Sequence, residues 1–437
     1  MKALNICLYE FKHFYRNKPK VLAYFLFVLA CFYALYSGKN LQKKQQETIV
    51  SIELKQQEAK TKILSWFDKG EKGPEDRPWI DVTIPFWAIW YTPTYAIKQP
   101  TALLPLGIGQ TEQYGYYKQV TNWSSTYDND MVEELSNPER LLNGNIDFSF
   151  LLIFLLPMLL IILTYDIYGL EQDLNFDKLV HVQTGSTQKW IMARLNFYTM
   201  LLLFTVVLFI VTTAVMNDAF EGHFSQIISL ILLSTVYIIF WAVTFYFIIT
   251  KSKGSSAQAF LMISVWLLLC VLIPGGVHQL ASIKYPANYM TEYLDVNRKE
   301  AYAIFKLSPD TLAIRLKTIY PDLTKTKHGQ DSIADEGIIN NTMSAIINQM
   351  NKVAIDKIEL QNEMKNKFIV SSYWYNPVSF TQNKWNSLLA TDYNAYKVYR
   401  DNVQKAIDKK IQMLVFECWD KKKVNKDTYE NYSRILR

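Results

Sequence analysis

Long apolar runs without a single charged residue alternate with polar segments along the chain. The runs occupy five ranges: 21–37, 148–165, 195–215, 227–250 and 260–277. Folded as a helix, each would be roughly 25–36 Å long, which suits the hydrocarbon core of a bilayer. A buried helix in a large soluble core explains one such run but not all five. The pattern therefore predicts five membrane-spanning helices.

The first 20 residues follow a different, amphipathic pattern. Four apolar residues recur there at helical spacing: Leu4, Leu8, Phe11 and Tyr15. The segment carries one acid, Glu10, and five basic residues: Lys2, Lys12, Arg16, Lys18 and Lys20. This combination predicts a helix at a membrane surface. A secretory signal peptide is the alternative, but no small-residue cleavage site follows the apolar run, so we expect an uncleaved first span.

The basic residues near the ends of the spans set the orientation. The short loop 251–258 carries two lysines and no acid, whereas 216–226 carries two acids and no lysine or arginine. The positive-inside rule then predicts that the N-terminus, 166–194 and 251–258 are cytoplasmic. It places two large segments outside: 38–147 and 278–437.

Both outer segments carry helical signals. The first opens with a charged helix that continues span 1, and then becomes rich in proline and aromatic residues. The second contains a short coiled-coil-like seam that ends before Lys357: Ile339, Met343, Ile346, Met350 and Val353. Because the repeat is short, we expect an intramolecular helical hairpin there rather than an inter-chain coiled coil. The predicted fold is mainly α: a polytopic α-helical membrane protein with two extracytoplasmic, largely helical insertions.

Two residues of the second run have a predictable local role. Pro157 removes one backbone donor in mid-span, so a neighbouring helix must accommodate a kink. Asp147 directly precedes the run, where a helix N-terminus favours an anion. We expect both residues to shape and cap the span rather than to contact a substrate. In the fifth run, Pro274 to Gly276 are expected to break the helix.

Composition and charge exclude several classes of function. Half of the 437 residues are hydrophobic, yet the mean hydropathy is near zero, as in a membrane protein with large aqueous parts. The net charge of +6 is modest and the charges are mixed, which argues against nucleic-acid binding. The sequence contains no nucleotide-binding P-loop, and no zinc-protease or serine-hydrolase motif. We therefore expect no enzyme, no metal site and no cofactor in this chain, and any energy must come from another polypeptide.

The stretch 137–166 resembles the signature of a bacterial sub-family of ABC-2-type permeases, the membrane subunits of ABC transporters whose ATPase is a separate chain. In that sub-family an Asn-Pro…Leu-Leu-x-Gly…Asp-x-x-Phe phrase precedes a span that contains Leu-Leu-Pro and closes on Tyr-Asp. The matching positions are Asn137, Pro138, Leu141, Leu142, Gly144, Asp147, Phe150, Leu155, Leu156, Pro157, Tyr165 and Asp166. Segments 98–120 and 376–407 also resemble sequence motifs in the outer domains of the sub-family.

The resemblance implies a permease of a bacterial inner membrane that exports a substrate, or that passes ATP-driven motion to its outer domains. ATP and Mg would bind to a partner ATPase dimer, and a second permease copy or paralogue would complete the complex. Membrane lipid and further periplasmic or outer-membrane proteins are the other partners it leaves open. The family has six spans, so we expect the natural protein to continue into one more beyond Arg437. A membrane-anchored scaffold or sensor without transport is the alternative function.

The resemblance also assigns a role to the cytoplasmic loop 166–194. In ABC-2-type permeases this loop supplies a coupling helix that docks in a groove on the ATPase. The residues expected to couple are Glu171, Asp173, Leu174, Lys178, Leu179, Val182 and Gln183. In the family, this loop carries two acids separated by one residue, followed by a motif like Gly-Thr-Leu. The acids are present here as Glu171 and Asp173, but the Gly-Thr-Leu motif is not. From the residues alone, a surface helix with solvated acids is the alternative.

Overall fold

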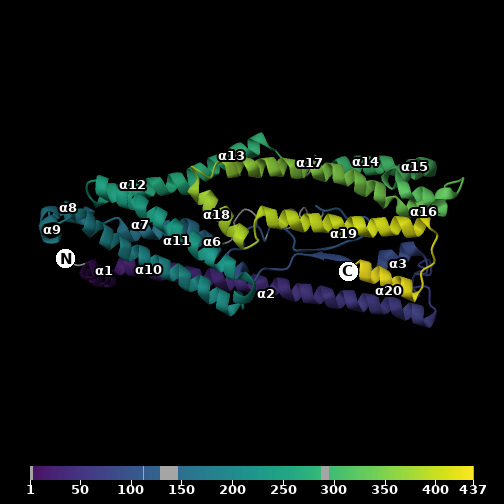
Figure 1. Ribbon diagram of the computed structural model, residues 1–437, viewed down its shortest axis with the longest axis horizontal. Coiled ribbons are helices and arrows are strands. Elements are labelled where there is room, and N and C mark those ends of the chain that lie inside the picture. Colours follow the sequence, from purple (N-terminus) through teal and green to yellow (C-terminus); the bar gives the residue numbers. More distant parts are fainter. Residues whose placement is uncertain (1–2, 112, 128–145, 287–294, 437) are drawn as a thin grey trace.

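The chain is mainly helical and elongated, with apolar helices gathered toward one end and polar helices toward the other (Figure 1). The computed structural model describes residues 3–111, 113–127, 146–286 and 295–436. Five helices in this part are long and apolar enough to cross a membrane: Lys18–Lys69, Phe148–Asp173, Thr187–Met216, Phe220–Lys251 and Ser255–Lys284. The predictions of a mainly α chain and of five candidate spans are confirmed.

Helix α2 (Lys18–Lys69) belongs to both ends of the molecule (Figure 1). The short helix α1 (Ala3–Arg16) precedes it, and the Asn17 side chain caps the start of α2 by accepting the N–H of Lys20. The apolar run gives way to a polar amphipathic sequence without a helix breaker, so the helix continues for 52 residues. Gly70, with a left-handed φ of 73°, then terminates it. The prediction that a charged helix continues the first span is confirmed.

The apolar bundle forms around the second span. It begins with α6 (Phe148–Phe150), the π-helical segment η2 (Leu151–Leu155) and α7 (Leu156–Thr164). Two thirds of the apolar stretch of this span is buried, more than in any other candidate span. The surrounding elements are α2, α10 (Thr187–Met216), α11 (Phe220–Lys251), α12 (Ser255–Leu267), the π-helical segment η3 (Leu268–Leu272) and α13 (Ile273–Lys284).

The expected helix break at Pro274 to Gly276 is wrong. The chain passes from η3 directly into α13, which carries Pro274 at its start and continues to Lys284. A π-helical turn provides the local change of geometry that absorbs the missing proline donor, so the helix continues through it. The fifth candidate span consequently extends beyond residue 277, where the apolar run had been expected to end.

The polar end contains a small sheet and a helical assembly. Strands β1 (Tyr95–Ile97) and β2 (Tyr117–Gln119) pair antiparallel, with Tyr95 opposite Gln119. The remaining elements are α3 (Pro85–Tyr91), η1 (Leu104–Leu106), α14 (Asp295–Phe305), α15 (Pro309–Ile319), η5 (Pro321–Lys325), η6 (His328–Gln330), α16 (Glu336–Thr342), α17 (Ser344–Ser371), α18 (Pro377–Leu388), α19 (Tyr393–Trp419) and α20 (Lys426–Ile435).

The predicted seam is only partly buried. Ile339, Met343 and Ile346 lie in a core that α15, α16, α17 and α19 share, whereas Val353 is 67% exposed. The seam therefore ends before Val353, earlier than the sequence indicated. Its apolar residues pack against other helices of the same chain, in agreement with the intramolecular packing that we expected there.

Close contacts join the two ends of the molecule. A β-carbon on Gly38 of α2 would lie 2.7 Å from the Cα of Pro105, so only glycine allows η1 to approach this helix. On the other side of η1, the indole of Trp385 donates a 2.8 Å hydrogen bond to the carbonyl oxygen of Leu106. Because Trp385 belongs to α18, which packs on α11, η1 is held between α2 and the apolar bundle.

Candidate functional site: an exposed apolar face above buried ion pairs

Two short helices connect α7 to α10 at one end of the bundle (Figure 1). Helix α8 (Gly169–Asp173) lies between Tyr168 and Asn175, whose left-handed φ values of 63° and 60° turn the chain on either side. Helix α9 (Asp177–Thr184) ends at Gly185, which is also left-handed. The single surface helix suggested by the sequence is therefore two helices joined by a sharp turn.

These helices expose large apolar side chains. No described residue of α9 is buried, and five large apolar residues of the loop have exposed fractions between 42% and 80%: Leu170, Leu174, Phe176, Leu179 and Val182. The polar side chains of Lys178 and Gln183, also expected to couple, are exposed on the same helix. We call the five exposed apolar residues, Leu170, Leu174, Phe176, Leu179 and Val182, the docking face. A cluster of apolar side chains left in water is unfavourable unless something covers it, so such a surface typically marks a binding site.

The two acids expected to couple, Glu171 and Asp173, contact the protein itself. Glu171 accepts a 2.6 Å hydrogen bond from the guanidinium of Arg194. Asp173, although exposed, caps the start of α12 by accepting the backbone N–H of Ser255 at 3.1 Å and the Ser255 hydroxyl. Between them, Gln172 accepts the N–H of Gly254 at 2.8 Å. The acids that the family resemblance assigned to coupling thus hold the loop in place, and the apolar residues face outward.

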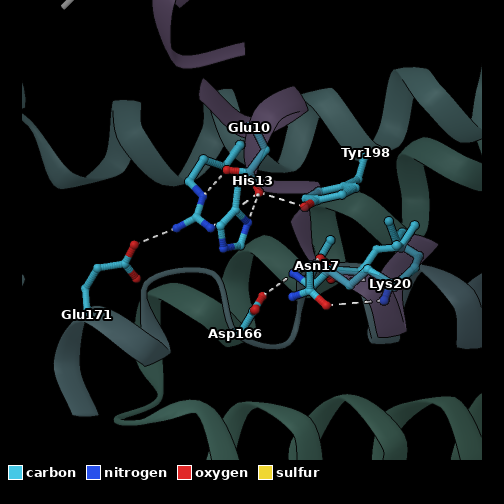
Figure 2. Close-up of polar contacts among 11 residues, drawn as sticks. Glu10, His13, Asn17, Lys20, Asp166, Glu171 and Tyr198 are labelled. Carbon is cyan, nitrogen blue, oxygen red and sulfur yellow. Dashed lines mark hydrogen bonds and ion pairs between the residues drawn. The ribbon is translucent and has the colours of Figure 1, made fainter. Parts of the chain in front are cut away.

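Arg194 is the centre of a buried ion-pair network, and its partners Glu10 and Glu171 are labelled in Figure 2. Its Nε donates to Glu10 at 2.6 Å, and the hydroxyl of Tyr198 donates to the same carboxylate at 2.7 Å. Both charged side chains are almost fully buried, and Arg194 also lies over the ring of Trp190. A buried charge is tolerated only when its partners replace water, so each of these contacts is needed by the others.

The carboxyl group of Glu10 remains ionised in this setting. Burial alone raises its pKa, but the hydrogen bond from His13 and the positive charge of Arg194 outweigh burial and lower the pKa to about 2. The His13 ring nitrogen lies 3.5 Å from the carboxylate. The acid therefore carries its charge over the whole physiological pH range, and helix α1 stays tied to α10.

A second ion pair joins the start of α2 to the end of α7 (Figure 2). The buried ammonium of Lys20 lies 2.6 Å from Asp166 and also donates to the carbonyl oxygen of Leu163 at 2.8 Å. Tyr165, the other residue of the Tyr-Asp pair, is partly exposed, and its carbonyl oxygen lies 2.8 Å from the amide nitrogen that Gln258 of α12 turns toward it. The last turn of α7 is thus fixed from two neighbouring helices.

The other residues of the family signature have structural roles where the structure describes them. Asp147 accepts the N–H groups of Phe150 and Ile108, each at 2.8 Å, so it caps α6 as expected and also holds the segment after η1. Pro157 follows the π-helical segment η2, and the carbonyl oxygen of Ile153, which its missing N–H would otherwise bond, accepts the hydroxyl of Tyr237 on α11. A neighbouring helix thus compensates for the proline, as expected. Five signature residues lie outside the described part of the chain: Asn137, Pro138, Leu141, Leu142 and Gly144.

Sequence reasoning missed the residues that support the docking face. Glu10 and Lys20 were interpreted as charges of a surface helix, and Arg194 was given no role. One signal was present: Glu10 is the only acid among the first 20 residues, next to five basic ones. The partner of Glu10 lies 184 residues further along the chain, and no local pattern indicates such a pairing.

No protein-family model, no curated protein and no solved structure matches this chain. Within the described residues, no three histidine, cysteine, aspartate or glutamate side chains are grouped so that they could hold a metal ion. The chemistry that the site does offer is recognition: apolar side chains presented on a backbone that ion pairs and helix caps keep fixed.

Proposed function

We propose that this chain is the membrane subunit of a bacterial ABC transporter of the ABC-2 type, driven by a separate ATPase subunit. The observation that carries the proposal is the docking face on α8 and α9, next to candidate membrane spans in a chain without a nucleotide-binding motif. In this proposal the protein resides in the inner membrane, and it exports a substrate or transmits motion across the membrane.

The docking face has the properties that a helix-in-groove contact needs. Its apolar side chains, among them Leu179 and Val182, project from short helices and can enter an apolar groove on a partner. Glu171 and Asp173 hold the loop in place through hydrogen bonds to α10 and α12. Little conformational entropy is therefore lost when a partner binds. A partner ATPase dimer, which would carry ATP and Mg, is the occupant that we propose.

The distribution of charge supports this end as the cytoplasmic one. Helix α1, the docking face and the α11–α12 turn lie together in Figure 1. The basic residues of 3–20 and the lysines of 251–258 belong to this end, and the positive-inside rule assigns such segments to the cytoplasm. The segment 38–147 and the helices α14 to α20 would then lie outside the membrane, as the two insertions of a polytopic membrane protein.

Helix α2 favours mechanical transmission as one form of this function. Its first turn contains Lys20, which is paired with Asp166, and its last turns lie in a core of the polar end, where Ile63 and Trp66 are buried. A continuous helix of 52 residues is a stiff connection between these points. Movement imposed on α1 and α8 by an ATPase would therefore displace the distal helices.

The proposal is tested by recovering the ATPase with the full-length chain from native membranes and identifying it by mass spectrometry. We expect Leu179→Asp and Val182→Asp to reduce the recovery at least tenfold, because each places a carboxylate in an apolar contact. Ile333→Asp is the matched control, since Ile333 and Val182 are each 80% exposed and Ile333 lies at the opposite end. Full recovery with Val182→Asp would refute the docking role.

The same experiment separates the proposal from its alternative. If the wild-type chain recovers no ATP-hydrolysing subunit but does recover a periplasmic protein, a membrane-anchored scaffold or sensor is the correct function. The double change Glu171→Arg with Asp173→Arg is less informative, because both acids hold the loop and their loss would also disturb its fold.

A further inference from the structure

A polar cleft of about 450 Å³ lies where α13, α17, α18 and the start of α19 meet. Six of its described lining residues carry side-chain amides: Gln110, Asn362, Asn366, Asn383, Asn386 and Asn394. Each amide offers two donor hydrogens and an acceptor oxygen. The walls can therefore donate and accept hydrogen bonds at many points, which suits a ligand that bears hydroxyl groups.

The protein leaves part of this hydrogen-bonding capacity unused. The side-chain oxygens of Gln110 and Asn386 are buried and accept no hydrogen bond from the described residues. Asn383, by contrast, donates to the hydroxyl of Tyr373 at 2.8 Å. Because buried acceptors are normally paired, these two side chains keep hydrogen-bonding capacity that the described chain does not use.

The cleft is also positively charged. Lys365 and Lys384 line it together with His278, and Asp392 is the only carboxylate among the described lining residues. That carboxylate already caps α19 by accepting the N–H of Ala395 at 3.2 Å. An excess of ammonium groups in a concave site attracts an anion.

Aromatic residues surround the cleft at the boundary between the apolar and polar ends. The turn between α17 and α18 exposes 86% of Trp374, whose ring meets that of Tyr375 edge-on at 4.9 Å. Phe380 lines the cleft and is itself partly exposed, and its helix, α18, packs on α11 and on both π-helical segments. Tryptophan and tyrosine gather in this way at the level of lipid headgroups.

We propose that this cleft binds an anionic, hydroxyl-bearing headgroup of the glycerol phosphate type. The phosphate would lie against Lys365 and Lys384, and the amides would bind the hydroxyl groups. Two sources offer this chemistry, namely a phospholipid such as phosphatidylglycerol and free glycerol phosphate. The lipid source rests on the membrane position proposed above, whereas the headgroup chemistry does not.

The test uses the full chain in nanodiscs of phosphatidylcholine. Titration with glycerol 1-phosphate is expected to saturate, and glycerol alone is not expected to bind. Native mass spectrometry with added short-chain phosphatidylglycerol or phosphatidylcholine measures the lipid arm. Preferential retention of phosphatidylglycerol supports a lipid headgroup, and binding of glycerol phosphate alone supports a free ligand. The proposal is refuted if glycerol 1-phosphate binds no more tightly than glycerol and phosphatidylglycerol is retained no better than phosphatidylcholine.

Two variants test the residues of the cleft. Lys384→Glu and Asn386→Asp each add a negative charge to the wall and are expected to weaken binding at least tenfold. Lys367→Glu is the control, because Lys367 is exposed on α17, pairs with Glu363 and does not line the cleft. If Lys367→Glu weakens headgroup binding as much as Lys384→Glu does, the binding depends only on overall charge and the cleft is not the site. If Asn386→Asp fails to fold, Lys384→Glu decides, because Lys384 is exposed.

The two proposals fail separately. ATPase recovery depends on the docking face at the other end of the bundle, so the cleft variants are expected to recover the ATPase normally. Loss of ATPase recovery with retained headgroup binding would refute the transporter proposal alone, and the reverse result would refute the cleft alone.

Discussion

The hydroxyl of Tyr237 donates a 2.6 Å hydrogen bond to the carbonyl oxygen of Ile153, the oxygen that the missing N–H of Pro157 would otherwise bond in an α-helix. At the next residue, the indole of Trp266 donates to the carbonyl oxygen of Phe154 at 3.0 Å. Side chains of α11 and α12 thus replace the backbone donors that the proline and the π-helical turn remove. In a hydrocarbon environment, where no water is available, this replacement is required.

Tyr237→Phe removes this donor and keeps the ring. We expect the change to lower the free energy of unfolding by about 1–2 kcal/mol, because a buried carbonyl loses a hydrogen bond. Thermal unfolding of the purified chain measures the effect. Tyr246→Phe on the same helix is the control, since the Tyr246 hydroxyl makes no hydrogen bond to the described residues, and the two variants should differ. Equal unfolding temperatures would contradict the role of Tyr237.

Arg194→Met leaves the buried carboxylate of Glu10 without its main partner. We expect a loss of about 3–5 kcal/mol in the free energy of unfolding, the usual cost of breaking one side of a buried ion pair. The double change Glu10→Gln with Arg194→Met should cost less than the sum of the single changes, because no uncompensated charge remains. Chemical denaturation of all three variants gives the coupling energy.

Lys189→Met is the control for this cycle, because Lys189 is exposed on the same helix. It should leave the unfolding midpoint unchanged. Hydrogen exchange adds a local readout: amides of α8 should lose protection in Arg194→Met, because Glu171 also loses its partner. Additive single effects, or unchanged protection in α8, would count against a coupled network.

Lys410 makes the stability of the polar end depend on pH. Its buried ammonium donates to the carbonyl oxygens of Thr92 and Val120, at 2.9 and 3.0 Å, and burial lowers its pKa to about 7. The unfolded chain keeps the ordinary pKa of 10.5, so between pH 7 and 10.5 the unfolded state binds a proton that the folded state does not. Stability should therefore rise with pH across this window, by up to about 1.4 kcal/mol per pH unit.

The unfolding temperature of the full chain, measured from pH 7 to pH 9, checks this dependence. Lys410→Met should flatten the rise, because the titrating group is gone. Lys409→Met, at the exposed neighbouring position, should keep it. If the unfolding temperature rises equally with pH in Lys410→Met and Lys409→Met, groups other than Lys410 cause the pH dependence.

The proposed topology predicts which positions react with a membrane-impermeant thiol reagent. In a Cys7→Ser background, Ser332→Cys should be labelled in intact spheroplasts and Gln183→Cys only in inverted vesicles. Both positions are exposed, and the other three cysteines are buried. Ser124, also in a segment expected outside, is buried and would label poorly. Protection of Ser332→Cys in spheroplasts would reverse the orientation.

The sequence by itself determined the features that depend on neighbouring residues. The five apolar runs predict candidate spans because length and local composition decide whether a helix can cross a membrane. Asp147 was recognisable as a cap, and Pro157 as a missing donor that a neighbouring helix must compensate, because both effects act within one helical turn. The exposed apolar side chains of the loop, such as Leu179 and Val182, were also visible as a pattern.

Only the tertiary structure decided which charged groups meet. Glu10 and Arg194, like Lys20 and Asp166, are each separated by well over 100 residues, and their charges are stabilised only because folding removes water from around both partners. The same packing turned Glu171 inward, away from the docking face, and isolated Lys410 between two carbonyl groups. Hydrophobicity and capping are properties of a short segment of chain, whereas the partner of a buried charge is fixed by how distant segments pack.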